Sequence, residues 1–414
     1  QEAAELSAKL LRQPLNADDA VRLALLNNPE LQARFAELGV AEAQAVESSL
    51  LRNPFLHAAL QTPRGDGRNA LDFSVSWDLL GLFSLPLRQA AAADARNSAR
   101  LQAAAHTLRL AADTRIAWYA DHSARESVER LRDMQESSDL IAEISKRLEA
   151  AGNQAGLARA DVQAASMQSR YALEDAEAQV EATQARLLGL LGVERMPSLP
   201  ERIPRLPQLD PKAPSRDELE ERHLDLTLLK AQLAQAEKRA GSSQRETWTD
   251  GLEAEWSWSR ESDGAWQDGP GICIGSPLFN TRAAARAAAG FEVERLQANL
   301  SARRAEVLRE AKLAETAMRR ARARVEHLRE NLLPLLAEAQ DTALLEYNAM
   351  HRSVAQLLDL KRREQDAIRQ LVQGLGEYWQ ARTALEALHL GVSIASPASV
   401  ATPRASARAA ETGH

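Results

Sequence analysis

The 414-residue chain has a single cysteine, Cys273, and only 4% of its residues are aromatic. One cysteine excludes an internal disulfide framework and any zinc site built on several thiolates. So few large aromatic side chains argue against the thick core of a doubly wound or barrel enzyme. Ala, Leu, Glu, Gln and Arg dominate instead, and these are strong helix formers. The composition therefore predicts a protein of long, thin helices.

The chain also has no block of charge of one sign and no long apolar run. Its 51 basic and 58 acidic residues are mixed along the sequence and give a net charge of −7. Without a segment rich in Lys and Arg to match backbone phosphates, we expect no nucleic-acid partner. No run of 18 apolar residues occurs, so we expect no transmembrane helix, and a membrane role would require strands. Because the chain begins at Gln1, we expect that a preceding segment has been removed.

Motifs of catalysis and metal binding are missing as well. The sequence has no GxSxG, P-loop, HExxH or CxxC pattern, and its eight histidines are dispersed without ligand spacing. We therefore predict a protein that is not an enzyme, with no cofactor and no bound metal. Cys273 lies in a predicted strand, where a small half-buried hydrophobe is the expected role.

An internal repeat organises the chain. Residues 100–103 (RLQA) recur at 295–298, an offset of 195 residues, and the same offset relates Leu31 to Leu226. Each half has a helix, a short non-helical stretch, a very long helix, a break and another helix. The halves are joined by residues 193–215, whose six prolines prevent continuous helix. The pattern predicts a twofold internal repeat.

Each half also contains a segment with a period of two, which is typical of strands. Leu71, Phe73, Val75 and Trp77 alternate with polar residues, and residues 55–60 form a plausible partner strand. In the second half, residues 252–258 and 266–274 repeat this plan. Four tryptophans lie in these two predicted hairpins: Trp77, Trp256, Trp258 and Trp266.

The helical pattern predicts the remaining elements. Asn16 or Asp18 can cap the first helix, and Pro334 should kink the penultimate one. The expected helices cover about 16–51, 87–149, 156–191, 216–244, 283–347 and 352–390.

Two interpretations of the hairpins remain open. They could be half-buried edge ribbons of a soluble helical protein, and periodicity alone does not separate this from the alternative. Alternatively, four amphipathic strands join strands of other copies in a transmembrane barrel, where aromatic residues lie at the membrane interface. The placement of one hairpin in each half favours the second interpretation, with the four tryptophans as interface aromatics.

The chain resembles the TolC-like outer membrane efflux proteins over residues 15–390. Residues 25–31 (LLNNPEL) resemble the opening helix of that family, and residues 276–279 (SPLF) resemble its strand-to-helix junction. Residues 160–163 (ADVQ) and 347–350 (YNAM) resemble its distal helical turns. The order and spacing of these strings, together with the repeat, carry the resemblance.

The resemblance implies a mixed α and β fold. A long antiparallel α-helical barrel in the periplasm would join a transmembrane β-barrel with four strands per chain in a homotrimer. Such a channel passively exports what an inner-membrane pump and a periplasmic adaptor deliver, and outer membrane lipid surrounds it. A soluble periplasmic coiled-coil scaffold or adaptor without a channel is the alternative, and the cargo is not specified.

The resemblance also implies a gate at the periplasmic tip. Arg352 matches the basic position of the family's run, Asp359 its second acidic position, and Gln356 replaces the first acid. Asp161 is the repeat equivalent of position 356 (356 − 195 = 161) and is the expected carboxylate partner of Arg352. Three copies of Asp359 would form a carboxylate ring that favours cations. Solvated helix ends, where an acid is favoured by the dipole, are the alternative interpretation.

These expectations divide the chain into eight segments. The first half comprises the N-terminal segment and first helix (1–53), a barrel hairpin (54–83) and a helical hairpin (84–192). An equatorial linker (193–215) follows. The second half comprises a helix (216–247), a barrel hairpin (248–279), a helical hairpin (280–391) and a disordered tail (392–414).

Overall fold

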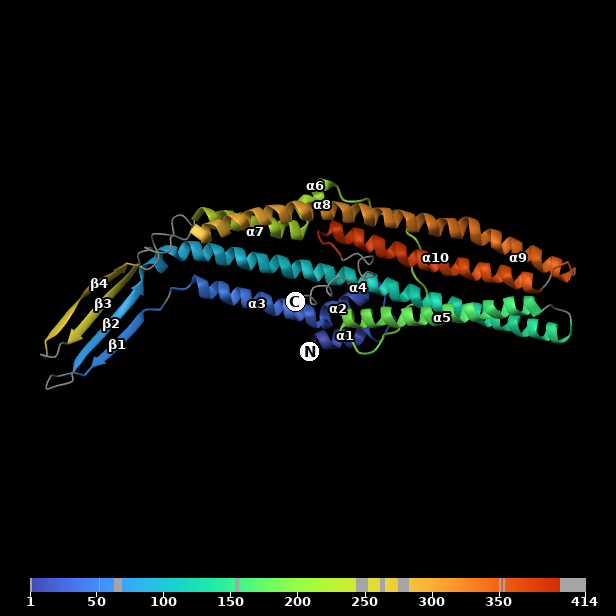
Figure 1. The fold of residues 1–414 in the computed structure, drawn as a ribbon, viewed down its shortest axis with the longest axis horizontal. Coiled ribbons are helices and arrows are strands. Elements are labelled where there is room, and N and C mark those ends of the chain that lie inside the picture. The colour runs from blue at the N-terminus through green and yellow to red at the C-terminus, as the bar shows by residue number, and fades with distance from the viewer. Residues whose placement is uncertain are drawn as a thin grey trace, which may run out of the picture. The chain divides into compact units, whose positions relative to one another are not determined.

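Figure 1 shows the fold in a computed structural model, which describes residues 2–51, 53–62, 69–152, 156–242, 252–260, 265–274, 283–349, 351–352 and 354–394. The chain forms two compact units. The first contains Gln1–Leu31, Ala105–His223 and Glu306–His414, and the second contains Gln32–Ala104 and Leu224–Ala305. The predicted junction at 276–279 and the tail from residue 395 lie outside the described residues.

The described helices follow the predicted order, with differences at their ends. The first unit holds α1 (Glu2–Leu10), α2 (Ala17–Asn27), α5 (Gly156–Leu191), α6 (Arg216–Arg222), the π-helix η2 (Leu328–Leu332), α9 (Leu333–Asn348) and α10 (Val354–His389). The second holds most of α3 (Pro29–Ser49) and all of α7 (Leu224–Ser242). Both units share α4 (Leu79–Ala150) and α8 (Ala283–His327). Helix α1 had not been predicted.

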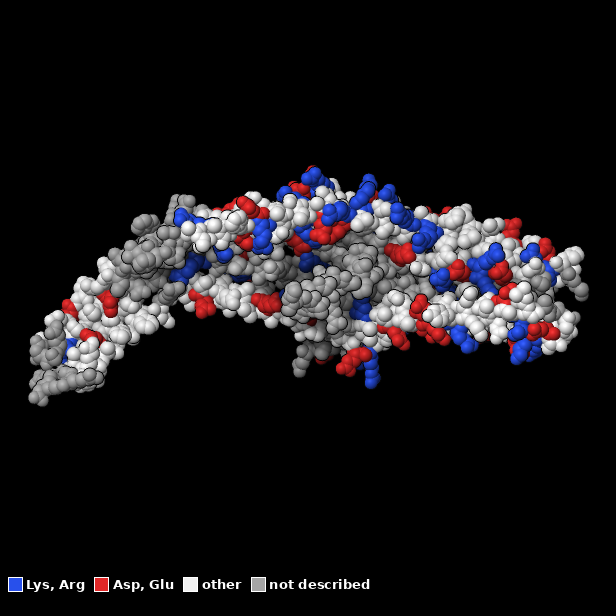
Figure 2. All heavy atoms as spheres, viewed as in Figure 1, with Lys and Arg blue, Asp and Glu red and all other residues white. Residues whose placement is uncertain are grey.

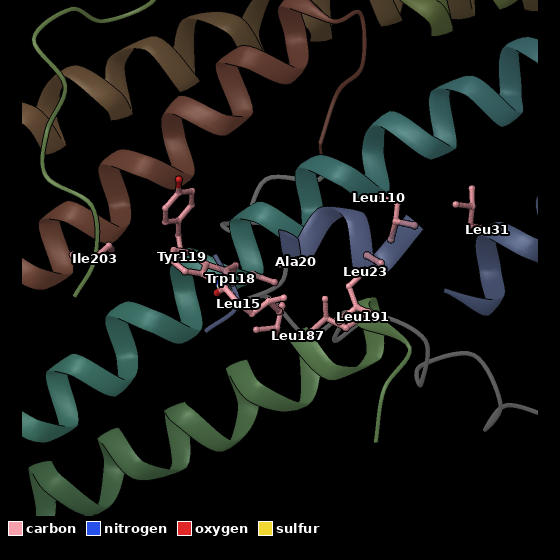
Figure 3. Packing of buried hydrophobic residues seen from close by; sticks show 12 residues of the cluster. Leu15, Ala20, Leu23, Leu31, Leu110, Trp118, Tyr119, Leu187, Leu191 and Ile203 are labelled. Carbon is pink, nitrogen blue, oxygen red and sulfur yellow. Dashed lines mark hydrogen bonds between the residues drawn. The ribbon is translucent and has the colours of Figure 1, made fainter. Parts of the chain in front are cut away.

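The core of the first unit gathers around Trp118 of α4 (Figure 3). Trp118 is buried, and its indole N–H donates to the carbonyl of Leu15 over 2.8 Å. Leu187 and Leu191 of α5 pack in the same cluster. A buried indole needs such a partner for its polar N–H, so this bond ties the segment before α2 to α4.

The prediction of a single helix over 16–51 is wrong, because the helix is interrupted at Asn28. Of the two predicted cap residues, Asn16 caps α2, with its side chain accepting from the Asp19 N–H. Asn28 is extended, with φ −66° and ψ 119°, since the ring of Pro29 disfavours helical backbone before it. The Asn28 side chain then accepts from the Leu31 N–H and donates to the Leu190 carbonyl over 3.0 Å.

The helix predicted over 216–244 is also broken, at the equivalent position His223. His223 has φ −69° and ψ 118° and lies 195 residues after Asn28 (223 − 28 = 195). It is buried, and its Nε2 lies 3.0 Å from Ser393 Oγ. Since Ser393 is buried too, the disordered tail predicted from residue 392 is wrong for residues 392–394.

Matching glycines follow α5 and α10. Gly192 has φ 64° and Gly391 has φ 86°, a left-handed conformation that favours glycine at helix ends. A Cβ on Gly192 would lie 2.6 Å from the Asn27 carbonyl oxygen, and one on Gly391 would clash with the Arg222 carbonyl. The helical hairpin that ends at Gly192 therefore packs against the helix break at Asn28, and the one that ends at Gly391 packs against the break at His223.

The linker 193–215 has no helix or strand, but it is attached to the helices of the first unit. The Pro204 carbonyl accepts from the Trp379 indole over 2.9 Å, and Asp210 accepts from Arg322 and from the Tyr378 hydroxyl. Burial, together with the bond to Asp210, raises the pKa of Tyr378. These bonds hold the linker against α8 and α10.

The two long helices differ from the prediction near their prolines. Helix α4 begins at Leu79 rather than 87 and contains Pro86, which removes one intrahelical hydrogen bond. The helix predicted over 283–347 changes type before Pro334. There the Leu333 N–H bonds back five residues to Leu328, and Pro334 falls in the first turn of α9, where no N–H is needed. A π-turn of this kind is a known cause of a kink.

The second unit contains the predicted strands. They are β1 (Phe55–Gln61), β2 (Ala70–Asp78), β3 (Leu252–Arg260) and β4 (Trp266–Ile274). They form one antiparallel sheet in the order β1-β2-β3-β4. The two hairpins are thus joined through β2 and β3, and β1 and β4 are the edges of the sheet.

Candidate functional site

The register of the sheet separates an apolar face from a polar one. Phe73 pairs with Trp258 and Val75 pairs with Trp256, so these residues share a face. Residues two positions apart along a strand point the same way. The apolar face therefore carries Leu56, Leu60, Leu71, Phe73, Val75, Trp77, Trp256, Trp258, Trp266 and Ile272, and its charged residues are Arg260 and Asp268.

All four tryptophans predicted to lie at a membrane interface share this face. Trp77 and Trp266 are 51% and 62% exposed. The Trp256 and Trp258 rings lie 6.4 Å apart, and the Arg260 guanidinium lies over the Trp266 ring. Alternation in the sequence predicted which side chains share a face within a strand. Only the register shows that both hairpins turn their tryptophans to the same side of the sheet.

The opposite face is mostly polar. It carries Gln61, Asp72, Ser74, Ser76, Glu255, Ser257, Ser259 and Gln267, with Phe55 at one end of β1. The Gln61 amide donates to Asp72 over 3.4 Å on this side. The two faces of the sheet therefore differ in polarity.

A contiguous exposed apolar face marks an interaction surface. Phe73, Leu56, Leu60 and Ile272 are all exposed together with the tryptophans. Strands β1 and β4 each pair on one side only in the described chain, so the edges also have unpaired backbone groups. The apolar face is therefore available for burial in an apolar environment, and the two edge strands are available to pair with other strands.

The tip of the first helical hairpin lies between α4 and α5. Gly152 has φ 73° at the end of α4. Glu149 of α4 pairs with Arg159 of α5, with 2.6 Å between Oε2 and Nε. Asp161 is exposed in the second turn of α5. Figure 2 shows acidic and basic side chains intermixed over the distal helices.

The tip of the second hairpin has a similar clasp. Arg352 Nε lies 2.7 Å from Glu346 Oε2 at the end of α9. Gln356 is exposed on α10, and Asp359 pairs with Arg363 one turn later over 2.8 Å. In both hairpins an Arg after the turn holds a Glu before it.

The structure therefore places the four predicted gate residues on two hairpin tips. Within one chain Arg352 pairs with Glu346 of its own hairpin rather than with Asp161. Sequence reasoning missed Glu346 and the pair of Glu149 and Arg159. An acid before each distal turn and an Arg after it was the available signal.

Other kinds of site have no support among the described residues. No helix there combines the length and apolarity needed to span a bilayer. No group of three or more His, Cys, Asp or Glu side chains in the described ranges could hold a metal ion.

Several known structures share the overall fold of this chain. The outer membrane channel CmeC of Campylobacter jejuni matches with a TM-score of 0.75 at 15% identity, over 93% of this chain and 88% of its own. The open-state outer membrane channel MtrE of Neisseria gonorrhoeae matches with 0.71 at 16%, over 91% and 89%. A membrane protein of Pseudomonas aeruginosa matches with 0.73 at 20%, over 90% and 93%.

The fold is that of the TolC-like outer membrane channels. No protein-family model and no curated protein matches the chain, so the likeness concerns the fold.

Proposed function

We propose that the chain is one subunit of an outer membrane channel in a tripartite efflux system. Three copies would close their sheets into a twelve-stranded barrel, and their helical hairpins into a periplasmic tunnel. The channel would conduct passively and have no chemistry of its own.

The apolar face of the sheet is the observation that carries this proposal. A barrel turns such a face to lipid and its polar face to water, with no edge left unpaired. Trp77, Trp256, Trp258 and Trp266 would then contact outer membrane lipid, and Asp72 and Glu255 would line the lumen. The internal repeat supports the same assembly, since each half supplies one strand hairpin and one helical hairpin.

The hairpin tips are the proposed gate. Arg352 bound to Glu346 stabilises the second turn, and exposed Asp161 offers a further carboxylate on the first hairpin of a neighbouring copy. Three Asp359 carboxylates in a threefold ring would raise the local concentration of cations. Three copies of Gln356 would form a neutral ring next to the Asp359 ring, since Gln356 lies one turn earlier on α10.

A passive duct needs an external source of energy. We assign this role to an inner-membrane pump that reaches the channel through a periplasmic adaptor, as the likeness of fold suggests. The proposal leaves the transported substrate open.

Reconstitution into planar bilayers tests the proposal. The purified full chain should form a trimer in detergent and produce discrete conductance steps. A monodisperse monomer that needs no detergent and produces no steps would support the scaffold alternative instead.

The same bilayers test the gate. Arg352→Gln should raise single-channel conductance, because the clasp to Glu346 is lost, whereas Arg147→Gln on exposed α4 should not. Asp359→Asn should move the reversal potential under a salt gradient toward zero. Unchanged values for both variants would remove these residues from the gate.

A further inference from the structure

The apolar face of the sheet includes a basic side chain, Arg260, at the last position of β3. Arg260 pairs with Trp266, the first residue of β4, and its guanidinium carbon lies 6.0 Å from the centroid of the Trp266 ring. On its other side Arg260 pairs with the exposed Leu71 of β2. Because an indole face attracts a cation, Trp266 holds the guanidinium on the apolar side of the sheet.

The charge of Arg260 has no use inside the chain. Among the described residues, no ion pair involves Arg260 and no acceptor bonds to its Nε. Asp268 lies on the same face, opposite Trp258 and two residues beyond Trp266, and it does not pair with Arg260. A guanidinium carries five N–H donors, so Arg260 has donors left for an acceptor from outside.

Arg260 also lies at the end of the sheet that is not joined to helices. Strand β2 ends at Asp78, directly before α4 begins at Leu79, whereas β3 ends at Arg260 on the way to β4. Strand β3 has nine residues, about the length that a tilted strand needs to cross a bilayer. Its last residue therefore lies at the level of the lipid headgroups, where an Arg extends its charged end toward water. The helices are periplasmic, so this is the outer interface.

From this placement we infer that Arg260 and Trp266 bind a phosphorylated lipid headgroup of the outer leaflet. The guanidinium would donate two parallel N–H bonds to phosphate oxygens, a geometry that its planar fork suits. The Trp266 ring would keep this fork at the depth of the headgroup. The inference rests on the proposed channel and names the class of lipid that its outer rim binds.

The surroundings of Arg260 favour a lipid over a free phosphate ion. Leu60, Leu71 and Trp266 are exposed at the same level of the sheet. Acyl chains would cover this apolar surface, which is favourable in proportion to its area, whereas a free ion gains nothing from it. Since the Asp268 carboxylate repels any anion nearby, the covered apolar surface is needed to retain the ligand.

Binding of lipid A, a phosphorylated glycolipid, to the purified full chain in detergent tests the inference. Native mass spectrometry measures the dissociation constants of diphosphoryl lipid A and of the same lipid without its phosphates. The original chain should bind the diphosphoryl form about tenfold more tightly, as a charge-assisted contact allows. Arg260→Gln should reduce this preference to about twofold or less. Arg147→Gln, on exposed α4, is the matched control and should keep the full preference.

Two further variants separate the parts of the site. Trp266→Leu keeps an apolar side chain but removes the indole face, and should weaken the binding of diphosphoryl lipid A about threefold. Asp268→Asn removes the neighbouring carboxylate and should leave this binding unchanged or make it tighter. Weaker binding by Asp268→Asn would indicate that a cation at Asp268 holds the headgroup, and would overturn the direct contact with Arg260.

The remaining outcomes distinguish the ligand and the inference from the proposed function. Displacement of lipid A by excess inorganic phosphate would assign the site to a free anion and overturn the inference. A conducting trimer that binds both forms of lipid A equally, or whose preference survives Arg260→Gln, would overturn it too and leave the channel standing. A chain that forms no trimer and no conductance steps contradicts the membrane placement on which both rest.

Discussion

Replacing Trp258 by Arg should impair membrane insertion more than replacing its neighbour Ser257 by Arg. The two residues are adjacent on β3 but lie on opposite faces of the sheet. In the proposed barrel Trp258 contacts lipid and Ser257 faces the water-filled lumen. The same new charge therefore meets lipid in one variant and water in the other.

The magnitude follows from the exposure of Trp258, which is 37%. That fraction of a side chain of about 250 Å² is about 90 Å², which contributes about 2 kcal/mol when lipid covers it. An Arg at the membrane interface, where the tryptophans are expected to lie, adds a penalty of about 0–1 kcal/mol. Trp258→Arg should thus destabilise the inserted state by about 2–3 kcal/mol per chain, and Ser257→Arg by about 1 kcal/mol or less.

Refolding from urea into lipid vesicles measures the difference. The folded fraction is followed as the heat-sensitive band on denaturing gels over a urea series. Equal effects of Trp258→Arg and Ser257→Arg would refute the assignment of the two faces, as would a larger effect of Ser257→Arg.

Two further changes test the first unit. Asn28→Ala should lower the free energy of unfolding by about 2 kcal/mol, because the cap on Leu31 and the bond to the Leu190 carbonyl are both lost. Denaturant unfolding followed by circular dichroism measures this loss. Asn28→Ser keeps the cap and should recover about half of the lost free energy. Burial raises the pKa of the Asp113 carboxyl, so stability falls as pH rises through that pKa. Asp113→Asn should therefore raise the melting temperature at neutral pH and leave it unchanged at about pH 3, where the carboxyl is protonated in both states; a gain of equal size at both pH values would contradict the role of ionisation.

The strands could be predicted because their periodicity is local. Alternation from Leu71 to Trp77 and in residues 252–258 fixes which side chains share a face within a strand. The joining of the two hairpins through β2 and β3 depends on contacts between segments about 180 residues apart, which no local pattern contains. The common side of the four tryptophans is a consequence of that register.

The helix breaks show where sequence reasoning failed. Pro29 is compatible with the first turn of a helix, so the pattern from Asn16 to Leu51 concealed a break at Asn28. His223 has no proline after it, and its local sequence predicts continuous helix. Only the repeat offset that relates it to Asn28 could have located this break.

The proposed gate residues show a similar division. Asp359 and Arg352 are proposed from the resemblance, which did not predict the ion pair of Arg352 with Glu346. An acid on the same hairpin, Glu346, reaches it across a short turn, whereas Asp161 belongs to another hairpin. Proximity in the turn decided the pairing within one chain.

The central claim is that the tryptophan face of the sheet contacts lipid while the opposite face contacts water. Spin labels placed one at a time at residues 254–259 of the protein in vesicles test it most directly, through collision with oxygen, which concentrates in lipid, and with a water-soluble nickel chelate. The account predicts a period of two, with positions 254, 256 and 258 accessible to oxygen and positions 255, 257 and 259 accessible to nickel. Equal access to nickel at all six positions would contradict it.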